Sequence, residues 1–220
     1  MKINGFDTKD TFEYENGFYL TMDNERMGKL IAHYVLYNKI INLPGAIVEC
    51  GVFKGNSFFR WGHFRNLLEN EKSRKLIGFD AFGEFPETSF DPDKQKRDSF
   101  INVAGNGISI EDMEKVMSYK KFSHYELIKG DITKTIPEYC DKHPEFKIAF
   151  LHIDVDIYEP TVTILENLFD KVVRGGVIVF DDYSTFPGET RALDDFMINN
   201  SSITLQKLPF YYKPTFIIKE

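Results

Sequence analysis

A strand that runs directly into a glycine turn constrains the fold of this chain more than any other feature. The apolar run Ala46–Cys50 predicts a buried strand, the turn Gly51–Gly55 follows it, and a helix is predicted to begin at Asn56 or Ser57. Glycine lacks a Cβ atom and adopts positive φ readily, so backbone atoms in such a turn can approach a small ligand closely. The segment therefore predicts an α/β fold with a ligand site where this strand ends.

Strands and helices alternate along most of the remaining chain. Further strands are expected at residues 75–79, 125–129, 148–153 and 177–180, and helices at 26–41, 57–69, 110–118, 136–142, 161–169 and 190–200. This alternation predicts a doubly wound, mostly parallel sheet that is covered by helices on both faces. Two late strands near residues 203–207 and 215–219 complete seven strands and are expected to form an antiparallel hairpin at one edge.

Two regions interrupt this alternation within what is expected to be a single domain, residues 1–220. Residues 83–122 are polar and rich in turn residues, which predicts a lid over the site, with a surface excursion of no function as the alternative. Lys94–Arg97 within this region is expected to be a solvated loop. Residues 1–45 are expected to form a helical segment on the substrate side, and its aromatic first part is expected to pack on its own domain or on a neighbouring subunit.

Charge and hydropathy exclude several classes of partner. The formal net charge is -7 and no basic run is present, which argues against nonspecific nucleic-acid binding. No stretch approaches the ~20 apolar residues of a membrane span, and Met1–Asp10 is polar, unlike a signal peptide. Cys50 and Cys140 form no metal-type pair. We therefore expect a cytoplasmic protein without a membrane or nucleic-acid partner.

Carboxylates follow three of the predicted strands. Asp80 ends the strand at 75–79, Asp154 follows the strand at 148–153, and Asp181 and Asp182 follow the strand at 177–180. In parallel sheets the ligand lies beyond the carboxyl ends of the strands. If the strands at 148–153 and 177–180 are neighbours, Asp154, Asp181 and Asp182 can share one hard cation such as Mg²⁺, which prefers oxygen ligands. Solvated helix caps are the alternative for Asp181 and Asp182.

Three segments carry a resemblance to a known family. They are residues 47–55 (IVECGVFKG), residues 78–82 (GFDAF) with Phe85-Pro86, and residues 152–161 (HIDVDIYEPT) with 175–183 (GGVIVFDDY). The chain resembles the class I S-adenosylmethionine-dependent methyltransferases and, within them, the macrocin O-methyltransferase family, which methylates sugar hydroxyls. The similarity spans roughly residues 26 to 196, although residues 88–122 depart from the family pattern.

The resemblance implies roles for the residues near the glycine turn. Gly51, Gly55 and Ser57 would hold the methionine tail of S-adenosylmethionine, and Glu49 would support either the ammonium group of that tail or the turn itself. Asp80 would accept from the ribose hydroxyls, because a carboxylate can accept from both at once.

Asp131 and Asp156 each fit two roles in this scheme. Asp131 resembles the family's adenine-side acid, but it equally fits a cap for the next helix. Asp156 is expected either to reach the cofactor amine or to orient the metal ligands.

The same resemblance implies a metal-assisted methyl transfer. A cation held by Asp154, Asp181 and Asp182 would lower the pKa of an acceptor hydroxyl and orient it. Asp154 is the first candidate for the general base. His152 is the rival, but it alternates with Asp154 along a buried strand and fits a packed core histidine better.

Several functions stay open from the sequence. The leading hypothesis is O-methylation of a glycoside or nucleotide-linked sugar, and the closest alternative is O-methylation of another diol such as a catechol. A non-catalytic domain that binds the nucleoside cofactor is a third, although a mere binder has no need of three clustered carboxylates. The turn Gly51–Gly55 lacks the third glycine of G-x-G-x-x-G, so a dinucleotide oxidoreductase is not indicated. Family habit implies a homodimer.

Overall fold

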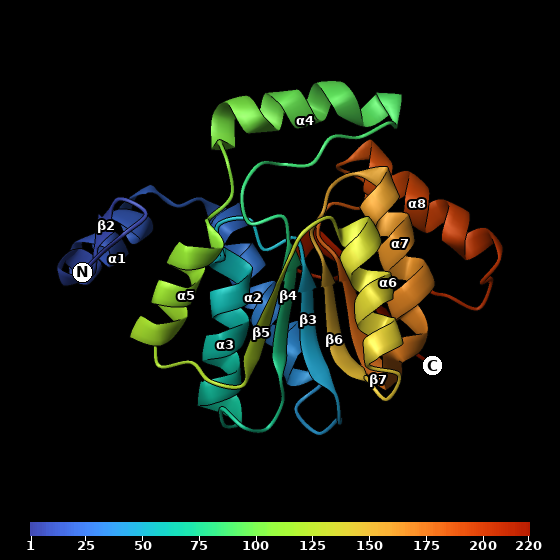
Figure 1. The fold of residues 1–220 in the computed structure, drawn as a ribbon, viewed down its shortest axis with the longest axis horizontal. Helices are drawn as coiled ribbons and strands as arrows, with labels where there is room; N and C mark the ends of the chain where they lie inside the picture. The colour runs from blue at the N-terminus through green and yellow to red at the C-terminus, as the bar shows by residue number, and fades with distance from the viewer.

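A computed structural model describes all residues 1–220 and is built around one seven-stranded sheet (Figure 1). The strands are β1 (Lys2–Ile3), β2 (Phe6–Asp7), β3 (Ala46–Cys50), β4 (Leu76–Asp80), β5 (Tyr125–Lys129), β6 (Ile148–Ile153), β7 (Val172–Phe180), β8 (Gln206–Leu208) and β9 (Tyr211–Ile218). The helices are α1 (Thr11–Thr21), α2 (Asn24–Asn38), α3 (Asn56–Leu68), α4 (Asp91–Ala104), α5 (Ile110–Tyr119), α6 (Ile132–Lys142), α7 (Tyr158–Leu168) and α8 (Pro187–Ile198), with short 3-10 turns at Thr8–Asp10 and Phe169–Lys171.

The strand order of the sheet confirms the predicted fold class. The order is β5-β4-β3-β6-β7-β9-β8, and the five strands from β5 to β7 are parallel. Strand β9 pairs antiparallel with β7, and β8 pairs antiparallel with β9, as the expected hairpin does. The chain runs outward from β3 through β4 to β5 and then returns to β6, so the strand order reverses between β3 and β6. A ligand binds at such a reversal in open α/β sheets.

Helices cover both faces of this sheet and bury two apolar clusters. Helices α2, α3 and α5 pack on one face, where Trp61, Leu36 and Met113 are fully buried against the strands. Helices α6, α7 and α8 pack on the other face through residues such as Ile136 and Leu193. None of the helices combines the length and the apolar character needed to cross a membrane.

The element boundaries differ from the sequence expectation mainly where polar residues hide a helix. Residues 91–104 were expected to be turn-rich, but they form α4. Only Asp93 of this helix is buried, so its sequence carries no apolar period. Helix α1 lies within the N-terminal segment that was expected to be helical, but it buries no residue, so no apolar period marked its bounds. Strand β7 begins at Val172 rather than residue 177, because the strand continues through Gly175 and Gly176.

The prediction of a solvated loop at Lys94–Arg97 was wrong, because these residues lie within α4. Arg97 donates to the carbonyl oxygens of Phe85 (2.8 Å) and Pro86 (2.6 Å), and the Lys96 ammonium donates to the carbonyl of Thr185. Arg97 therefore attaches α4 to the loop after β4, and Lys96 attaches it to the loop after β7.

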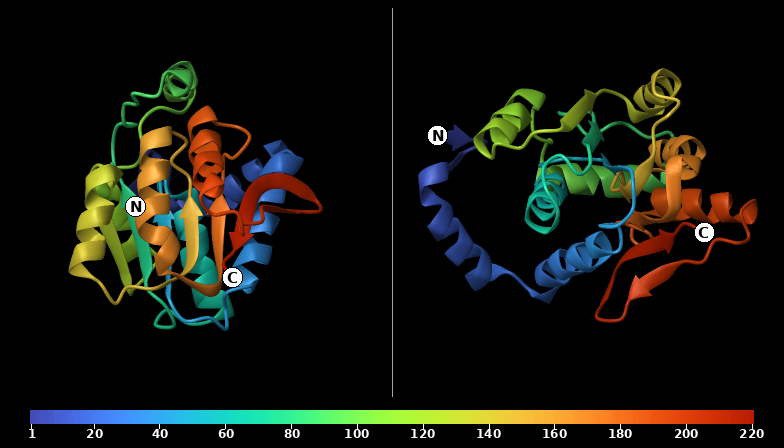
Figure 2. Two further views of the ribbon diagram at one scale, coloured as in Figure 1. Left: turned by 90° about the vertical axis from the view of Figure 1, so that its right-hand side faces the viewer. Right: turned by 90° about the horizontal axis from the view of Figure 1, so that it is seen from below.

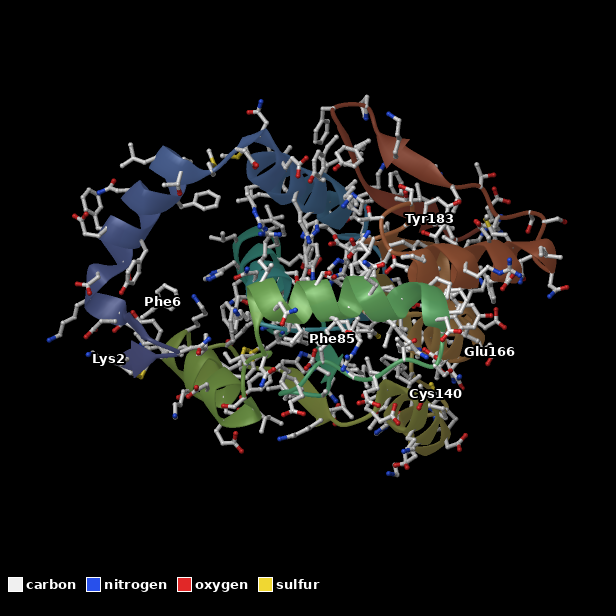
Figure 3. The ribbon with its side chains drawn as sticks, turned by 90° about the horizontal axis from the view of Figure 1, so that it is seen from above. Lys2, Phe6, Phe85, Cys140, Glu166 and Tyr183 are labelled. Carbon is white, nitrogen blue, oxygen red and sulfur yellow. The ribbon has the colours of Figure 1, made fainter.

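Helix α4 lies across the carboxyl ends of the strands, where a lid was expected (Figure 1). The carboxylate of Asp93 accepts from the backbone N–H of Tyr158 (3.0 Å) and of Gly188 (2.7 Å), which join α4 to the first turns of α7 and α8. Glu159 accepts from the backbone N–H of Ser89 at 2.8 Å, just before α4. In the view from above, α4 crosses the middle of the molecule and Phe85 lies close beside it (Figure 3).

The N-terminal segment extends away from the sheet. Seen from below, α1 and α2 follow one another around the edge of the molecule, and the β1–β2 hairpin returns to lie beside α5 (Figure 2). Helix α2 packs on the sheet through Ala32, Leu36 and Tyr37, whereas α1 leaves Phe12 70% and Leu20 85% exposed. Only α2 of this segment therefore reaches the carboxyl ends of the strands from within the core.

Candidate active site

A cavity of about 1370 Å³ opens at the carboxyl ends of the parallel strands. Most of the predicted site residues line it: Gly51, Ser57, Asp80, Asp131, Asp154, Asp156, Asp181 and Asp182. Glu49 and Gly55 do not. The sheet topology explains this gathering, because these residues end β3, β4, β6 and β7 or begin the helices that follow.

Gly51 lies where the glycine turn after β3 meets the loop after β6. Its φ is 90°, and a Cβ atom there would lie 1.8 Å from the backbone oxygen of Asp154. The backbone N–H of Asp154 in turn donates to the carbonyl of Cys50 at 2.9 Å. The glycine turn after β3 is therefore in direct backbone contact with the loop after β6. Gly55 has a φ of 82° and precedes the first residue of α3, so its conformation sets where that helix begins.

The Asp80 carboxylate is a backbone acceptor. Its Oδ2 accepts from the N–H groups of Val52 (2.7 Å) and Phe53 (3.0 Å), and its Oδ1 accepts from the N–H of Phe82 (2.5 Å). Burial raises the pKa of Asp80, and the three amide bonds oppose that rise. Asp80 thus fixes the glycine turn from the neighbouring strand while one side of its carboxylate still faces the cavity.

Glu49 lies beneath the turn and is fully buried. Its Oε1 accepts from the hydroxyl of Ser57 at 2.5 Å, and its Oε2 has no partner. Of the two roles that the sequence left open, this geometry favours support of the turn, with Ser57 between the glutamate and the cavity.

Asp131 sits at the N-terminus of α6. Its Oδ1 accepts from the backbone N–H of Thr133 at 3.0 Å, which is the helix-cap arrangement. These bonds, led by the one from the Thr133 hydroxyl, lower the pKa of Asp131. Since the residue also lines the cavity, capping and a contact with a ligand are compatible.

Three acids form a cluster across the ends of β6 and β7. One carboxylate oxygen from each of Asp154, Asp156 and Asp182 lies within 4.8 Å of the others. Burial and the charge of Asp181 raise the pKa of Asp154 to about 7, against the opposing charges of Lys29 and His152. Burial and the neighbouring acid charges raise the pKa values of Asp156 and Asp182 as well. Like charges held this close favour either a proton or a cation.

Asp181 has a different environment from these three. The Lys29 ammonium lies 2.5 Å from its Oδ2 and 3.9 Å from Oδ2 of Asp154, and Oδ1 of Asp181 faces two histidine rings. Burial alone raises the pKa of Asp181, but Lys29 and His152 outweigh it and hold that pKa well below its usual range. The structure therefore brings Asp154 and Asp182 together as predicted, with Asp156 as the nearest third acid, and supplies Asp181 with cations of the chain itself.

His152 is fully buried, as the core interpretation predicted. Its Nδ1 lies 3.7 Å from Oε1 of Glu49, and its Nε2 lies 3.6 Å from Oδ1 of Asp181. Burial lowers the pKa of His152, but the two carboxylates outweigh burial and raise it to about 10. The charges of the two carboxylates thus favour the protonated ring, which is a poorer base than the neutral ring. Asp154 thus keeps the stronger claim.

Three residues that no sequence motif indicated also lie at this site. Lys29 and His33 lie on one face of α2, and both side chains approach the Asp181 carboxylate. Glu189, fully buried at the start of α8, accepts from the backbone N–H of Asp182 at 2.8 Å. The i, i+4 spacing of Lys29 and His33 was the available signal, but it does not say which residues they would meet.

Comparison with known proteins gives the family. The model of the macrocin-O-methyltransferase (TylF) family matches residues 17–206. The demethyldecarbamoylnovobiocin O-methyltransferase of Streptomyces niveus is 27% identical over 183 residues, which cover 79% of this chain and 68% of that protein. A tetracenomycin-C 4'-O-methyltransferase of Streptomyces olivaceus, acting on the 8-demethyl-8-(2,3-dimethoxy-alpha-L-rhamnosyl) compound, is 29% identical over 148 residues, which cover 64% of this chain and 54% of that protein.

Solved structures agree on the fold. The calicheamicin methyltransferase CalS11 superposes with a TM-score of 0.74 at 24% identity, covering 96% of this chain and 86% of that one. The MycE methyltransferase, solved with Mg, SAH and mycinamycin VI, gives a TM-score of 0.50 at 16% identity, covering 85% of this chain and 48% of that one. With the glycine turn and acidic strand ends in place, and the family match spanning most of its length, this chain is a methyltransferase that belongs to the macrocin-O-methyltransferase family.

Proposed function

We propose that this protein transfers the methyl group of S-adenosylmethionine to a hydroxyl of a sugar, either in a glycoside or in a nucleotide-linked sugar, with the help of a divalent cation. The observation that carries the proposal is the direct backbone contact between Gly51 and Asp154, which places the turn expected to hold the cofactor beside the acid cluster in one cavity. Two relatives are named as O-methyltransferases, one of them of a rhamnosyl tetracenomycin, and the chain spans 68% and 54% of their lengths.

The cofactor half of the cavity is prepared by the protein itself. Gly51, Ser57 and Asp80 face the space, and the hydrogen bonds of Asp80 to the turn hold the backbone in place before a ligand arrives. Asp80 retains lone pairs for the ribose hydroxyls, because each carboxylate oxygen can accept more than one hydrogen bond. A turn that is fixed in advance loses little conformational entropy on binding.

The donor set of the acid cluster fits a hard divalent cation. Asp154, Asp156 and Asp182 offer oxygen atoms from neighbouring loops, and burial together with nearby acid charges raises the pKa of each, so a cation would stabilise the cluster. Asp154 and Asp182 would hold the ion, together with Asp156 or with Asp181 after release from Lys29. A bound cation of this kind lowers the pKa of a coordinated alcohol and orients it.

Asp154 is the residue proposed to receive the proton of the acceptor hydroxyl. It lines the cavity, contacts the glycine turn through its own backbone and lies within the acid cluster proposed to hold the cation. Lys29 and His152 oppose protonation of Asp154 through their positive charge. His152 also sets the position of Asp181 beneath it.

The cavity has space for an acceptor beyond the cofactor. Aromatic side chains from four regions line it: Phe18 of α1, Phe53 of the glycine turn, Phe85 and Phe100 of the 83–122 region, and Phe186 just before α8. Flat apolar surfaces of this kind suit a sugar ring or an attached aromatic or apolar group. Because α1 and the region over the strand ends both contribute, they are the segments we expect to choose the acceptor.

Two measurements test the proposal. S-adenosylhomocysteine is titrated into the purified protein by calorimetry with Mg²⁺ present, and one site per chain with micromolar affinity is expected. A panel of glycosides and nucleotide-sugars is then incubated with radiolabelled S-adenosylmethionine, with and without EDTA. Methyl transfer to a sugar hydroxyl that EDTA abolishes supports the proposal, whereas absent S-adenosylhomocysteine binding refutes it.

A further inference from the structure

Arg60 is a cation in the cavity wall without an anionic partner. It lies on α3, one turn beyond Ser57, and both residues line the cavity. Its guanidinium forms no ion pair, and its one hydrogen bond joins Nη1 to Nδ1 of His33 at 2.8 Å. Burial lowers the pKa of Arg60, and the more distant charges of Glu49 and Asp181 only partly offset that effect. An arginine stays protonated in such a place, so its charge is present and poorly compensated.

The other cations of the cavity wall are already solvated or engaged. Lys29 pairs with Asp181 at 2.5 Å, and Lys54 is exposed and donates to the carbonyl of Ala104 at 2.6 Å. Arg26 and Lys129 are exposed to water. Arg60 is half-buried and has no carboxylate partner, which leaves its guanidinium free to bind an anion.

His33 holds this guanidinium in one orientation. The ring is fully buried, stacks on Trp61 with a centroid distance of 4.4 Å and an interplanar angle of 24°, and has a pKa that burial lowers well below its ordinary value. A neutral ring that accepts at Nδ1 carries its proton on Nε2, and this nitrogen lies 3.9 Å from Oδ1 of Asp181. The ring therefore lies between Arg60 and Asp181, bonded to the arginine and not to the acid.

On the basis of the function proposed above, we infer that Arg60 binds the α-carboxylate of the methionine tail of the cofactor, with His33 as its positioning residue. The tail carries one carboxylate and one ammonium, and it is expected along the turn that ends at Ser57. Asp154, Asp156 and Asp181 face the same space. These acids suit the ammonium but repel the carboxylate, so the carboxylate needs a cation on the α3 side.

The test combines protein variants with ligands that differ in one group. Binding of S-adenosylhomocysteine, of its decarboxylated analogue S-adenosyl-3-thiopropylamine and of 5′-methylthioadenosine is measured by calorimetry for the wild type and for Arg60→Met. A charged hydrogen-bonded contact predicts a loss of about 10- to 100-fold for S-adenosylhomocysteine in the variant. The two ligands without a carboxylate should lose less than about threefold. Arg60→Lys, which keeps the charge but not the planar fork, should fall between the wild type and Arg60→Met.

Controls separate this inference from the proposed function. Arg174→Met changes an exposed arginine near the opposite end of β7 and should leave all three affinities unchanged. Equal losses for all three ligands, or an unchanged affinity for S-adenosylhomocysteine with a raised KM for the acceptor, would overturn the role of Arg60 alone. If the wild type binds no S-adenosylhomocysteine, both the role and the proposed function fall. Should Arg60→Met unfold, a wild type that fails to prefer S-adenosylhomocysteine over its decarboxylated analogue by at least about tenfold overturns the inference.

Discussion

Asp80 and Asp182 both follow the carboxyl end of a parallel strand, yet they meet opposite surroundings. Asp80 accepts three backbone N–H groups and fixes the glycine turn. Asp182 stands among other carboxylates, with its nearest cation, Lys213, 3.9 Å away. Backbone N–H groups satisfy the carboxylate at one strand end, and we propose that the carboxylate at the other binds a cation. The comparison shows that the environment, rather than the place at a strand end, decides what a carboxylate does.

The largest effect on stability and on cofactor binding is expected at the contact between the glycine turn and the loop after β6. Gly51→Ala would place a Cβ atom 1.8 Å from the backbone oxygen of Asp154 at a φ of 90°, so the turn or the loop must move. We expect the free energy of unfolding to fall by about 3 kcal/mol or more, and cofactor binding to be lost with it. Urea denaturation and S-adenosylhomocysteine titration measure both effects.

Gly17→Ala is the matched control for this substitution. Gly17 lies within α1, and a Cβ atom there meets nothing within 4 Å. Alanine should leave stability unchanged or raise it by about 0.5–1 kcal/mol, because glycine is the poorer helix former. A Gly51→Ala protein as stable as Gly17→Ala would contradict the contact described here.

Asp182→Asn should impair the proposed cation site and leave the proposed cofactor site intact. We expect turnover to fall by about 100-fold or more, because the cluster loses a charged cation ligand, while the affinity for S-adenosylhomocysteine changes by less than about threefold. Steady-state rates and calorimetry measure the two quantities. Asp141→Asn, on an exposed position of α6, should change neither. Wild-type turnover in Asp182→Asn, or in excess chelator, would remove the cation from the proposal.

Asp80→Asn should produce the reverse pattern. An amide keeps one acceptor oxygen, so at least one of the three backbone N–H bonds is lost, and we expect S-adenosylhomocysteine to bind about tenfold more weakly. Asp131→Asn provides the comparison, since an asparagine also caps a helix. A cap-only role predicts an affinity within about twofold of wild type, and a larger loss would assign Asp131 to the adenine.

The smallest effect concerns the attachment of α4. Hydrogen bonds from Ser89, Thr88 and the backbone outweigh burial and lower the pKa of Glu159. A depressed pKa means that this contribution to stability is present above the unfolded pKa of about 4.5 and is lost as the pH falls through the folded value. Because the side chain is largely solvated, we expect only a few tenths of a kcal/mol. Hydrogen exchange of the Ser89 and Phe90 amides should rise on acidification relative to neighbouring amides, and Glu159→Gln should abolish that pH dependence.

Much of the fold was readable because its signals are local. The bounds of β3, β5 and β6 are those that the sequence predicted, since short apolar runs between turn residues are typical of buried strands. Strand ends then gather the acids automatically, because parallel neighbours share one edge. Helix α4 escaped prediction for the opposite reason. Its one buried side chain, the carboxylate of Asp93, meets residues of α7 and α8 far along the chain.

The sequence by itself thus determined the sheet, the glycine turn and the set of acids at its edge. Only the tertiary structure decided which acid is satisfied and which is not. Lys29 reaches Asp181 across 152 residues of chain, and Arg60 meets His33 only because α2 and α3 pack on the same face. Charges interact through space, so the pairing of each carboxylate depends on helix packing that no local pattern encodes.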